Sequence, residues 1–159
     1  MDLKDKIKNL ADTYFNEMVA IRRHLHAHPE LSYEEVETSK FIAKKLTEFG
    51  IEHQTNIGGH GVVGLIKGKN PSSKTIALRG DMDALPIEEK NTTEYVSQNK
   101  GVMHACGHDV HTTSLMGAAK ILNELKEEFE GTIKLIFQPA EEKLPGGASI
   151  MIKEGVLEN

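Results

Sequence analysis

The only cysteine of the 159-residue chain lies between histidines in the stretch HACGHD. Cys106 and His108 are separated by Gly107, and a glycine permits the sharp turn that would bring a thiolate and an imidazole together. Both are ligands suited to zinc or another borderline transition metal. A helix starting here would favour the thiolate, and Asp109 could cap that helix or hold an imidazole. A buried structural cysteine with helix-capping neighbours is the alternative.

Two adjacent acids follow an apolar run near the end of the chain. Glu141 and Glu142 come after GTIKLIF and Pro139, where acids are costly unless they are paired or bind a metal. One carboxylate could bind a cation while the other moves protons. A solvated pair at the start of a loop is the alternative, and it is the usual explanation of an isolated Glu-Glu pair.

Two more acids, Asp81 and Asp83, lie at the end of the run KTIALRGD and just after it. They are either turn-forming residues or part of the same site. Sites in open α/β sheets form beyond the carboxyl ends of the strands, and a regular crossover would start the helix after HACGHD at that edge. We therefore expect these acids to converge with the Cys106 motif and the Glu141 pair.

A tract of three histidines, His24, His26 and His28, is interpreted as structural. It falls in the last turn of a predicted helix, where imidazoles suit the negative end of the helix dipole. The spacing would also fan the rings around the helix axis. His53 and His60 are expected on the surface of a strand or loop.

The elements that must position these residues alternate between helices and strands. Periodic apolar residues predict helices over residues 4–27, from a Ser32–Glu35 capping box to Gly50, over about 109–128, and over 147–154. Strands are expected in IEHQTNI, GVVGLIKG, KTIALRGD and GTIKLIF, the last two as buried central strands. This order predicts an α/β fold with a mixed, largely parallel sheet flanked by helices.

The composition limits the classes of function. The chain has 19 Lys+Arg, 24 Asp+Glu and a net charge of −5, with no basic stripe for nucleic acid. It has no apolar run long enough to cross a membrane and no signal-peptide pattern at its start. A single cysteine allows no intrachain disulfide, which favours a cytoplasmic location.

At these motifs the chain resembles the metal-dependent amidohydrolases that include hippurate hydrolase, bacterial N-acyl-amino-acid deacylases and plant auxin-conjugate hydrolases. They form a branch of the aminoacylase and carboxypeptidase family of metallopeptidases. The matching segments are RRHLHAHPELSYEE, RGDMDALPI, MHACGHDVHTTSLMGAAKIL, LIFQPAEE and GGASIMIKEGVLEN, in family order over nearly the whole chain. The resemblance implies a zinc-exopeptidase-like catalytic domain.

The resemblance also implies a role for each matching residue. The metal ligands would be Cys106, His108 and Glu142, the general base would be Glu141, and Asp83 would steady an active-site group. The implied cofactor is one or two divalent ions of zinc, manganese, cobalt or nickel. Asp81 stands where many relatives carry a metal-binding histidine, so the composition of a two-metal site is left open.

Family members are well over twice this length, so the resemblance implies that residues 1–159 are the N-terminal part of the catalytic domain. Two further histidine ligands and a lid or dimerisation domain would then lie outside this segment. We expect the segment alone to be inactive. The whole enzyme is expected to hydrolyse the amide bond of N-acyl amino acids or related conjugates, which are small molecules. Whether that enzyme is a homodimer is left open.

Two other functions remain at this stage. A metallo-exopeptidase or dipeptidase of the same family would carry the same motifs. A non-catalytic metal-binding module, or an inactive truncated fragment, belongs to a different class. The presence of Glu141 beside Glu142 argues against pure metal binding, because binding requires only one of the two acids.

Overall fold

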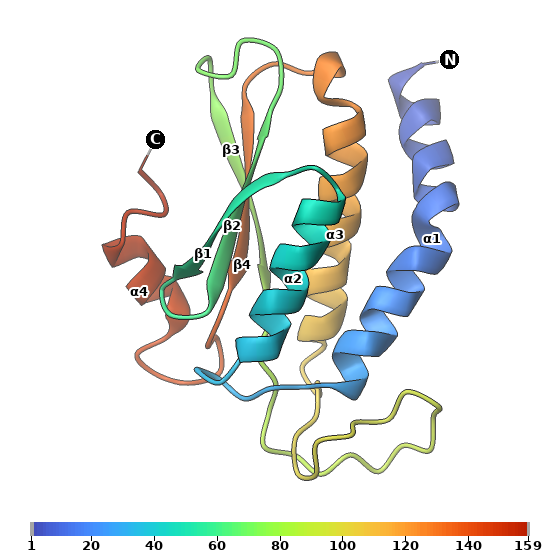
Figure 1. Cartoon of the computed structure of the whole chain (residues 1–159), viewed down its shortest axis with the longest axis vertical. Coiled ribbons are helices and arrows are strands. Elements are labelled where there is room, and N and C mark those ends of the chain that lie inside the picture. Colours follow the sequence, from blue (N-terminus) through green and yellow to red (C-terminus); the bar gives the residue numbers. More distant parts are fainter. Residues whose placement is uncertain (1, 159) are drawn as a thin grey trace.

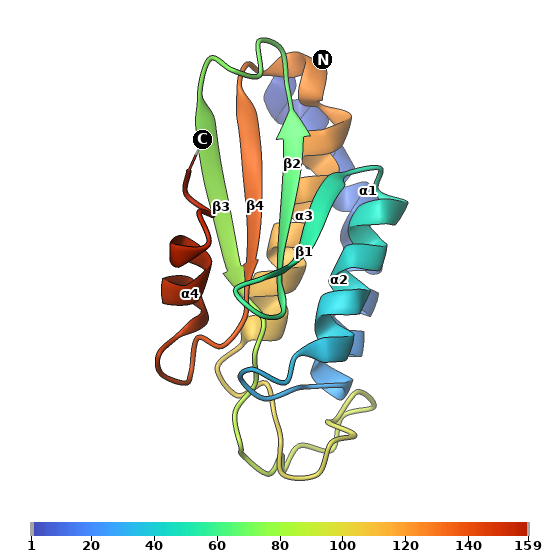
Figure 2. The same cartoon turned by 60° about the vertical axis from the view of Figure 1, so that its left-hand side comes forward.

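A four-stranded mixed sheet forms the centre of the protein. The computed structural model describes residues 2–158, and its strands are β1 (Glu52–Ile57), β2 (Gly61–Lys67), β3 (Thr75–Asp81) and β4 (Thr132–Gln138). Their order in the sheet is β1-β2-β4-β3 (Figure 1 and Figure 2). The predicted α/β class with a mixed sheet is confirmed. The sheet is not largely parallel, however, because only the β3–β4 pairing of the described strands is parallel.

The connections between the strands explain these directions. A helical crossover joins β3 to β4 and returns the chain in the same direction, so these two strands are parallel. A short turn joins β1 to β2 as an antiparallel hairpin, and β2 then pairs with the distant β4. The alternation of elements predicted the crossover, but it carried no information on the partner of β2.

Helices cover both faces of the sheet (Figure 1 and Figure 2). α2 (Val36–Glu48) and α3 (His108–Glu124) pack on one face, and α1 (Leu3–Ala27) packs against α3. The short α4 (Gly147–Lys153) covers the other face. The helix predicted to reach residue 128 ends at Glu124, and the 3-10 helix η1 (Lys126–Glu128) follows it. The other three predicted helices are confirmed within one or two residues.

The side chains of β4 alternate between two apolar clusters. Leu135 and Phe137 are fully buried in the main core with α2 and α3, whereas Ile136 contacts the cluster that includes Met151 of α4. This is the period of two that a strand imposes on its side chains. Burial of a side chain such as Phe137 contributes about 1.5–3 kcal/mol to stability. The prediction that β4 is a buried central strand is confirmed.

The matching prediction for β3 is wrong. β3 lies at the edge of the described sheet, its first five residues are exposed or half-buried, and Ile76 is 54% exposed. Only its last two residues, Gly80 and Asp81, are buried. The apolar run correctly indicated a strand, but the identity of the neighbours of a strand is a property of the topology.

The predicted capping box at the start of α2 does not form. The N-cap residue is Glu35, and its side chain makes no capping hydrogen bond. The carboxylate of Glu30 caps the helix instead, since it accepts hydrogen bonds from the backbone N–H groups of Glu37 and Thr38. The side chains of Ser32 and Glu35 are therefore free to bind the loops that follow β3 and β4.

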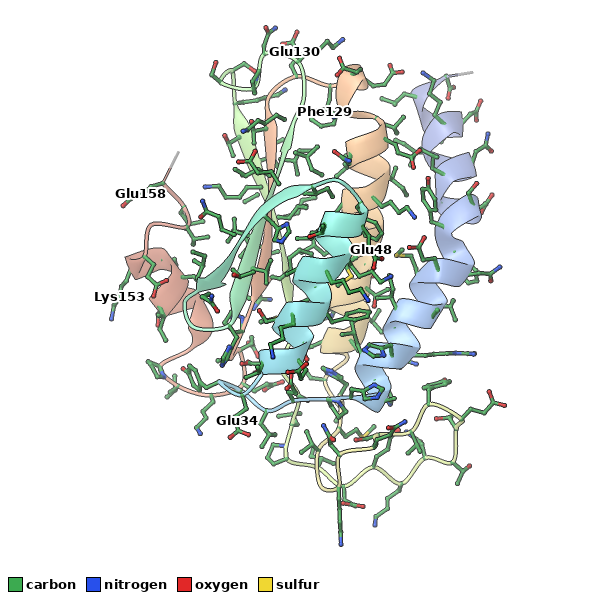
Figure 3. All side chains as sticks on the ribbon, viewed as in Figure 1. Glu34, Glu48, Phe129, Glu130, Lys153 and Glu158 are labelled. Carbon is green, nitrogen blue, oxygen red and sulfur yellow. The ribbon has the colours of Figure 1, made fainter. Side chains whose placement is uncertain are left out.

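A long connection joins β3 to α3 and extends beyond one end of the sheet (Figure 1). Figure 3 marks both ends: Glu34 lies at the end near this connection, and Phe129 and Glu130 lie at the opposite end. Between residues 2 and 158 no helix combines the length and the apolar character that a membrane span requires.

Candidate metal centre

The predicted convergence of the acids after β3 and β4 with the start of α3, at the carboxyl ends of these strands, is confirmed. β3 and β4 are parallel and in register up to Asp81 and Gln138, so the two loops that follow them leave side by side. The first turn of α3 reaches the same edge, where the hydroxyl of Thr112 donates to the carbonyl oxygen of Asp81 at 2.7 Å. Gly80 allows this close approach, since a Cβ there would lie 3.1 Å from the carbonyl oxygen of His111.

The imidazole of His108 is held with one nitrogen free for a ligand. Its ring is buried, and Nδ1 lies 2.9 Å from the carbonyl oxygen and 3.2 Å from Oδ1 of Asp83. Both partners are acceptors, so Nδ1 donates to Asp83 and Nε2 is the nitrogen left to bind a ligand. Nε2 lies 3.6 Å from Oδ2 of Asp81 and 3.7 Å from Oε1 of Glu142.

The three predicted metal ligands are brought together. One donor atom each from Cys106, His108 and Glu142 lies within 4.8 Å of the others. Gly107 has φ +85°, a left-handed conformation that suits glycine and turns the chain between the thiol and the imidazole. A tetrahedral ion with bonds of about 2.0–2.3 Å separates its donors by roughly 3.3–3.8 Å, so a sulfur, nitrogen and oxygen set of this size fits a zinc-like cation.

Without a cation the surroundings of Cys106 disfavour its thiolate. A hydrogen bond to Glu142 raises the pKa of the thiol above its ordinary value, and burial and the nearby carboxylates of Asp81 and Glu141 add to this effect. The expectation that the start of α3 would favour the thiolate is therefore not met by the protein alone. The carboxylates outweigh the helix dipole, and a cation is the group that can reverse the balance.

Asp83 links the loops after β3 and β4. Its Oδ2 accepts hydrogen bonds from the hydroxyl of Ser32 at 2.6 Å and from the backbone N–H of Glu142 at 3.0 Å. Burial alone would raise the pKa of Asp83, but these hydrogen bonds and the one from His108 lower it well below its ordinary range. Asp83 is thus an anionic acceptor that holds His108. Burial lowers the pKa of His108, but the two aspartates beside it, Asp81 and Asp83, outweigh burial and raise that pKa above its ordinary value.

A buried acid supports the turn that presents the two glutamates. Glu35 is fully buried, and its Oε1 accepts the backbone N–H of Ala140 at 2.7 Å. Ala140 has φ +48°, so this contact holds a left-handed residue just before Glu141. Burial raises the pKa of Glu35. Glu141 itself is exposed, next to the donor set.

A second donor set overlaps the first. Asp81, His108 and His111 also offer donor atoms within 4.8 Å of one another. Oδ1 of Asp81 lies 2.7 Å from Nδ1 of His111, and Oδ2 accepts from Arg79 at 2.7 Å. His111 was not predicted to be a ligand, although its position three residues after His108 places it on the same side of α3.

The histidine tract is structural, as predicted, but its arrangement differs from the prediction. None of its three rings joins a donor set of three or more residues in the described chain. His26 is buried, with Nδ1 2.7 Å from Oδ2 of Asp109 and Nε2 3.0 Å from Oε1 of Glu89. Asp109 therefore holds an imidazole, and its Oδ1 also accepts the backbone N–H of Val110 in the first turn of α3, whose N-cap residue is Gly107. Nothing local in the sequence predicts pairs that are 83 and 63 residues apart.

Another buried histidine, His104, lies between these two groups of residues. Its ring is 6.5 Å from that of His26, and neither of its nitrogens has a hydrogen-bond partner among the described residues. Burial lowers the pKa of His104 to about 4. The ring is therefore neutral at physiological pH.

Comparison with known proteins gives a consistent family. The family model described as peptidase family M20/M25/M40 matches residues 77–159. An N-acyl-L-amino acid amidohydrolase of Geobacillus stearothermophilus is 46% identical over 98% of this chain and 42% of its own length. Thermostable carboxypeptidase 2 of Saccharolobus solfataricus is 50% identical over 99% of this chain and 40% of its own length. The chain thus spans about two fifths of the length of these relatives.

A solved structure of similar fold comes from Bacillus subtilis and is described as a dinuclear metal binding peptidase of the M20 family. It has a TM-score of 0.85 and 44% sequence identity, and the match covers 92% of this chain and 41% of that one.

Proposed function

The chain belongs to peptidase family M20/M25/M40, and on this basis we propose that it carries the metal centre of an amidohydrolase that acts on N-acyl amino acids or related conjugates. The observation that carries the proposal is the donor set of Cys106, His108 and Glu142 beside Glu141, at the edge where β3 and β4 end. The similarity to an N-acyl-L-amino acid amidohydrolase supports this class of substrate.

The donor set would hold a divalent cation of the zinc, manganese, cobalt or nickel type. Such a cation supplies Lewis-acid chemistry, which lowers the pKa of a bound water to about 7 and polarises an amide carbonyl. Asp83 would keep Nε2 of His108 aimed at the cation. A single Nε2 lone pair binds one ion, so a second ion would depend on Asp81 and His111.

Glu141 would act as the general base. It lies directly beside the ligand Glu142 and is exposed, so its carboxylate can reach a water molecule without taking a place in the donor set. It would accept the proton of the attacking water and return it to the leaving amine. This division of roles explains why two adjacent acids are present where binding requires only one.

A metallo-exopeptidase is the second candidate, because a relative that is 50% identical is named a carboxypeptidase. The same donor set and the same base would serve it, since both reactions hydrolyse an amide bond. The substrate is a small molecule in either case. The cytoplasmic location favoured by the single cysteine, and the option of a homodimeric enzyme, remain proposals.

The two glutamates provide the test. Glu142→Gln should lower zinc occupancy, because the ligand loses its charge. In the whole enzyme, Glu141→Gln should leave occupancy intact while kcat for N-acyl amino acids falls by roughly 10²- to 10⁴-fold, which is the usual contribution of a general base. Occupancy is measured by metal analysis after dialysis, and rates on matched panels of N-acyl amino acids and dipeptides. Loss of zinc in Glu141→Gln with retention in Glu142→Gln would contradict the assigned roles.

A further inference from the structure

We propose that His26 is a positioning residue that clamps the 85–103 loop, the segment from Leu85 to Met103, onto the start of α3. The predicted effect of His26 on metal binding, the metal half of the inference, rests on the proposed function. Its predicted effect on the order of the 85–103 loop, the loop half, rests on the contacts of His26 alone. Neither half makes His26 a ligand or a group that touches substrate.

The first observation is that His26 bridges two buried carboxylates. Its side chain is 5% exposed, and the side chains of Asp109 and Glu89 are 0% and 2% exposed. Each ring nitrogen faces a carboxylate oxygen, at 2.7 Å and 3.0 Å. A carboxylate oxygen accepts, so each ring nitrogen is placed to donate to one of the two acids. The guanidinium of Arg22 also faces this pair, with Nε 2.9 Å from the same oxygen of Asp109 and Nη2 3.4 Å from Nδ1 of His26.

The second observation is that Glu89 holds the 85–103 loop together from within. Its Oε2 accepts the backbone N–H of Ser97 at 2.7 Å, and its Oε1 accepts from the side chain of Asn91 at 2.9 Å. Hydrogen bonds with His26 and Asn91 lower the pKa of Glu89 to about 2 against the opposing effect of burial, so it is ionised at neutral pH. The ring of Tyr95 meets the ring of His26 edge-on, with centroids 5.6 Å apart. His26 therefore holds the loop through Glu89, the acid that also binds Asn91 and Ser97 within the loop.

The third observation is the place where the loop is attached. It begins two residues after Asp83, which holds the ring of His108, and ends three residues before Cys106. Asp109, the other partner of His26, directly follows His108 in the first turn of α3. His26 thus links the 85–103 loop to the start of α3, and both ends of this loop lie within three residues of a residue of the metal centre. A movement of the loop would shift Asp83 and the thiol relative to the imidazole.

The exchange His26→Gln removes the bridge but keeps a side chain of similar reach. An amide has donors on one atom only, so its oxygen would face one of the two carboxylates and that contact is lost. Glu89→Gln weakens the loop half and leaves the contact of His26 with Asp109 in place. The matched control is His28→Gln, because His28 caps the end of the same helix, is exposed, and contacts His24 of that helix through its ring and its Nδ1.

Two readouts separate the clamp from a general loss of stability. Trypsin can cut the loop after Lys90 and Lys100, which are both exposed, so local opening appears as cleavage at these two sites. Zinc affinity, measured by competition with a chromophoric chelator, reports the geometry of the donor set. Far-UV circular dichroism and the urea midpoint show whether each variant is folded.

We expect His26→Gln to raise the rate of cleavage at Lys90 and Lys100 about 10-fold and to weaken zinc binding about 10-fold, the lower end of the range for residues that orient metal ligands. Glu89→Gln should raise loop cleavage to a similar extent, with a change in zinc affinity below about 3-fold. His28→Gln should change neither. If His26→Gln does not fold, Glu89→Gln tests the loop half and Asp109→Asn tests the metal half.

Unchanged cleavage and unchanged zinc affinity in folded His26→Gln would overturn the proposal. Cleavage spread over the whole chain would also overturn it, because a merely structural role produces that pattern. Failure of the proposed function looks different: zinc binding would then be insensitive to Cys106→Ser and His108→Ala, while the trypsin result would still decide whether the clamp exists.

Discussion

At the scale of single residues, hydrogen bonds to Asp83 position two of the three predicted ligands. The bond from Nδ1 of His108 to Asp83 exposes Nε2, and the backbone of Glu142 is fixed by the same aspartate. The sequence motif brought Cys106 and His108 together because they are two residues apart. The resemblance implied that Asp83 steadies an active-site group, and in the structure this group is the ring of His108, whereas Asp81 pairs with His111.

The titration of the donor atoms predicts how metal binding depends on pH. The pKa of His108 lies above its ordinary value of 6.5, and that of Cys106 above 9.0, so both atoms hold protons that a cation must displace. Zinc affinity should therefore rise with pH between about 6 and 9, with roughly one to two protons released per ion. Calorimetry in two buffers of different ionisation enthalpy measures this release. A pH-independent affinity would contradict it.

At the scale of elements, local signals predicted the segments well and their contacts poorly. The helical periodicity of α1 and α2 and the apolar runs of β3 and β4 were enough to predict those elements. The side chain of Ser32 was expected to cap α2, but its hydroxyl donates a hydrogen bond to Asp83 instead. A capping box is a local motif, whereas the observed partner of the Ser32 hydroxyl lies 51 residues away.

The junction between α2 and the turn after β4 makes a prediction about stability. Burial raises the pKa of Glu35, so the folded state binds its proton more tightly than the unfolded state does. The contribution of Glu35 to stability should then fall as pH rises above the ordinary value of 4.5 towards the raised pKa. Glu35→Gln keeps an acceptor for the N–H of Ala140 and cannot ionise, so its stability relative to the wild type should improve over this range.

Urea unfolding at several pH values measures this difference between the two proteins. Glu37→Gln is the control, because Glu37 lies in the first turn of the same helix and its side chain is 74% exposed. That variant should show no comparable trend. A loss of stability in Glu35→Gln that is the same at every pH would show that the charge of Glu35 is not what burial penalises.

At the scale of the whole molecule, the order of strands decides where the chemistry lies. The parallel pairing of β3 with β4 brings residues 81–83 and 139–142 together at the carboxyl ends of these strands. α3 starts there because it is the crossover between the two strands. The sequence was sufficient for this convergence, since it required only two strands and one helix. It was not sufficient for the position of β3 at the sheet edge or for the ion pairs of His26, because both depend on contacts between distant segments.

The central claim is that Cys106 binds a cation together with His108 and Glu142, and the labelling rate of its thiol tests that claim most directly. The chain has one cysteine, so every label reports this site. Coordination occupies the sulfur lone pair that would react. With zinc, the folded wild-type protein should be alkylated more slowly than after chelation, and Glu142→Gln should lose most of this protection. Equal rates with and without zinc in the folded wild type would remove Cys106 from the metal centre.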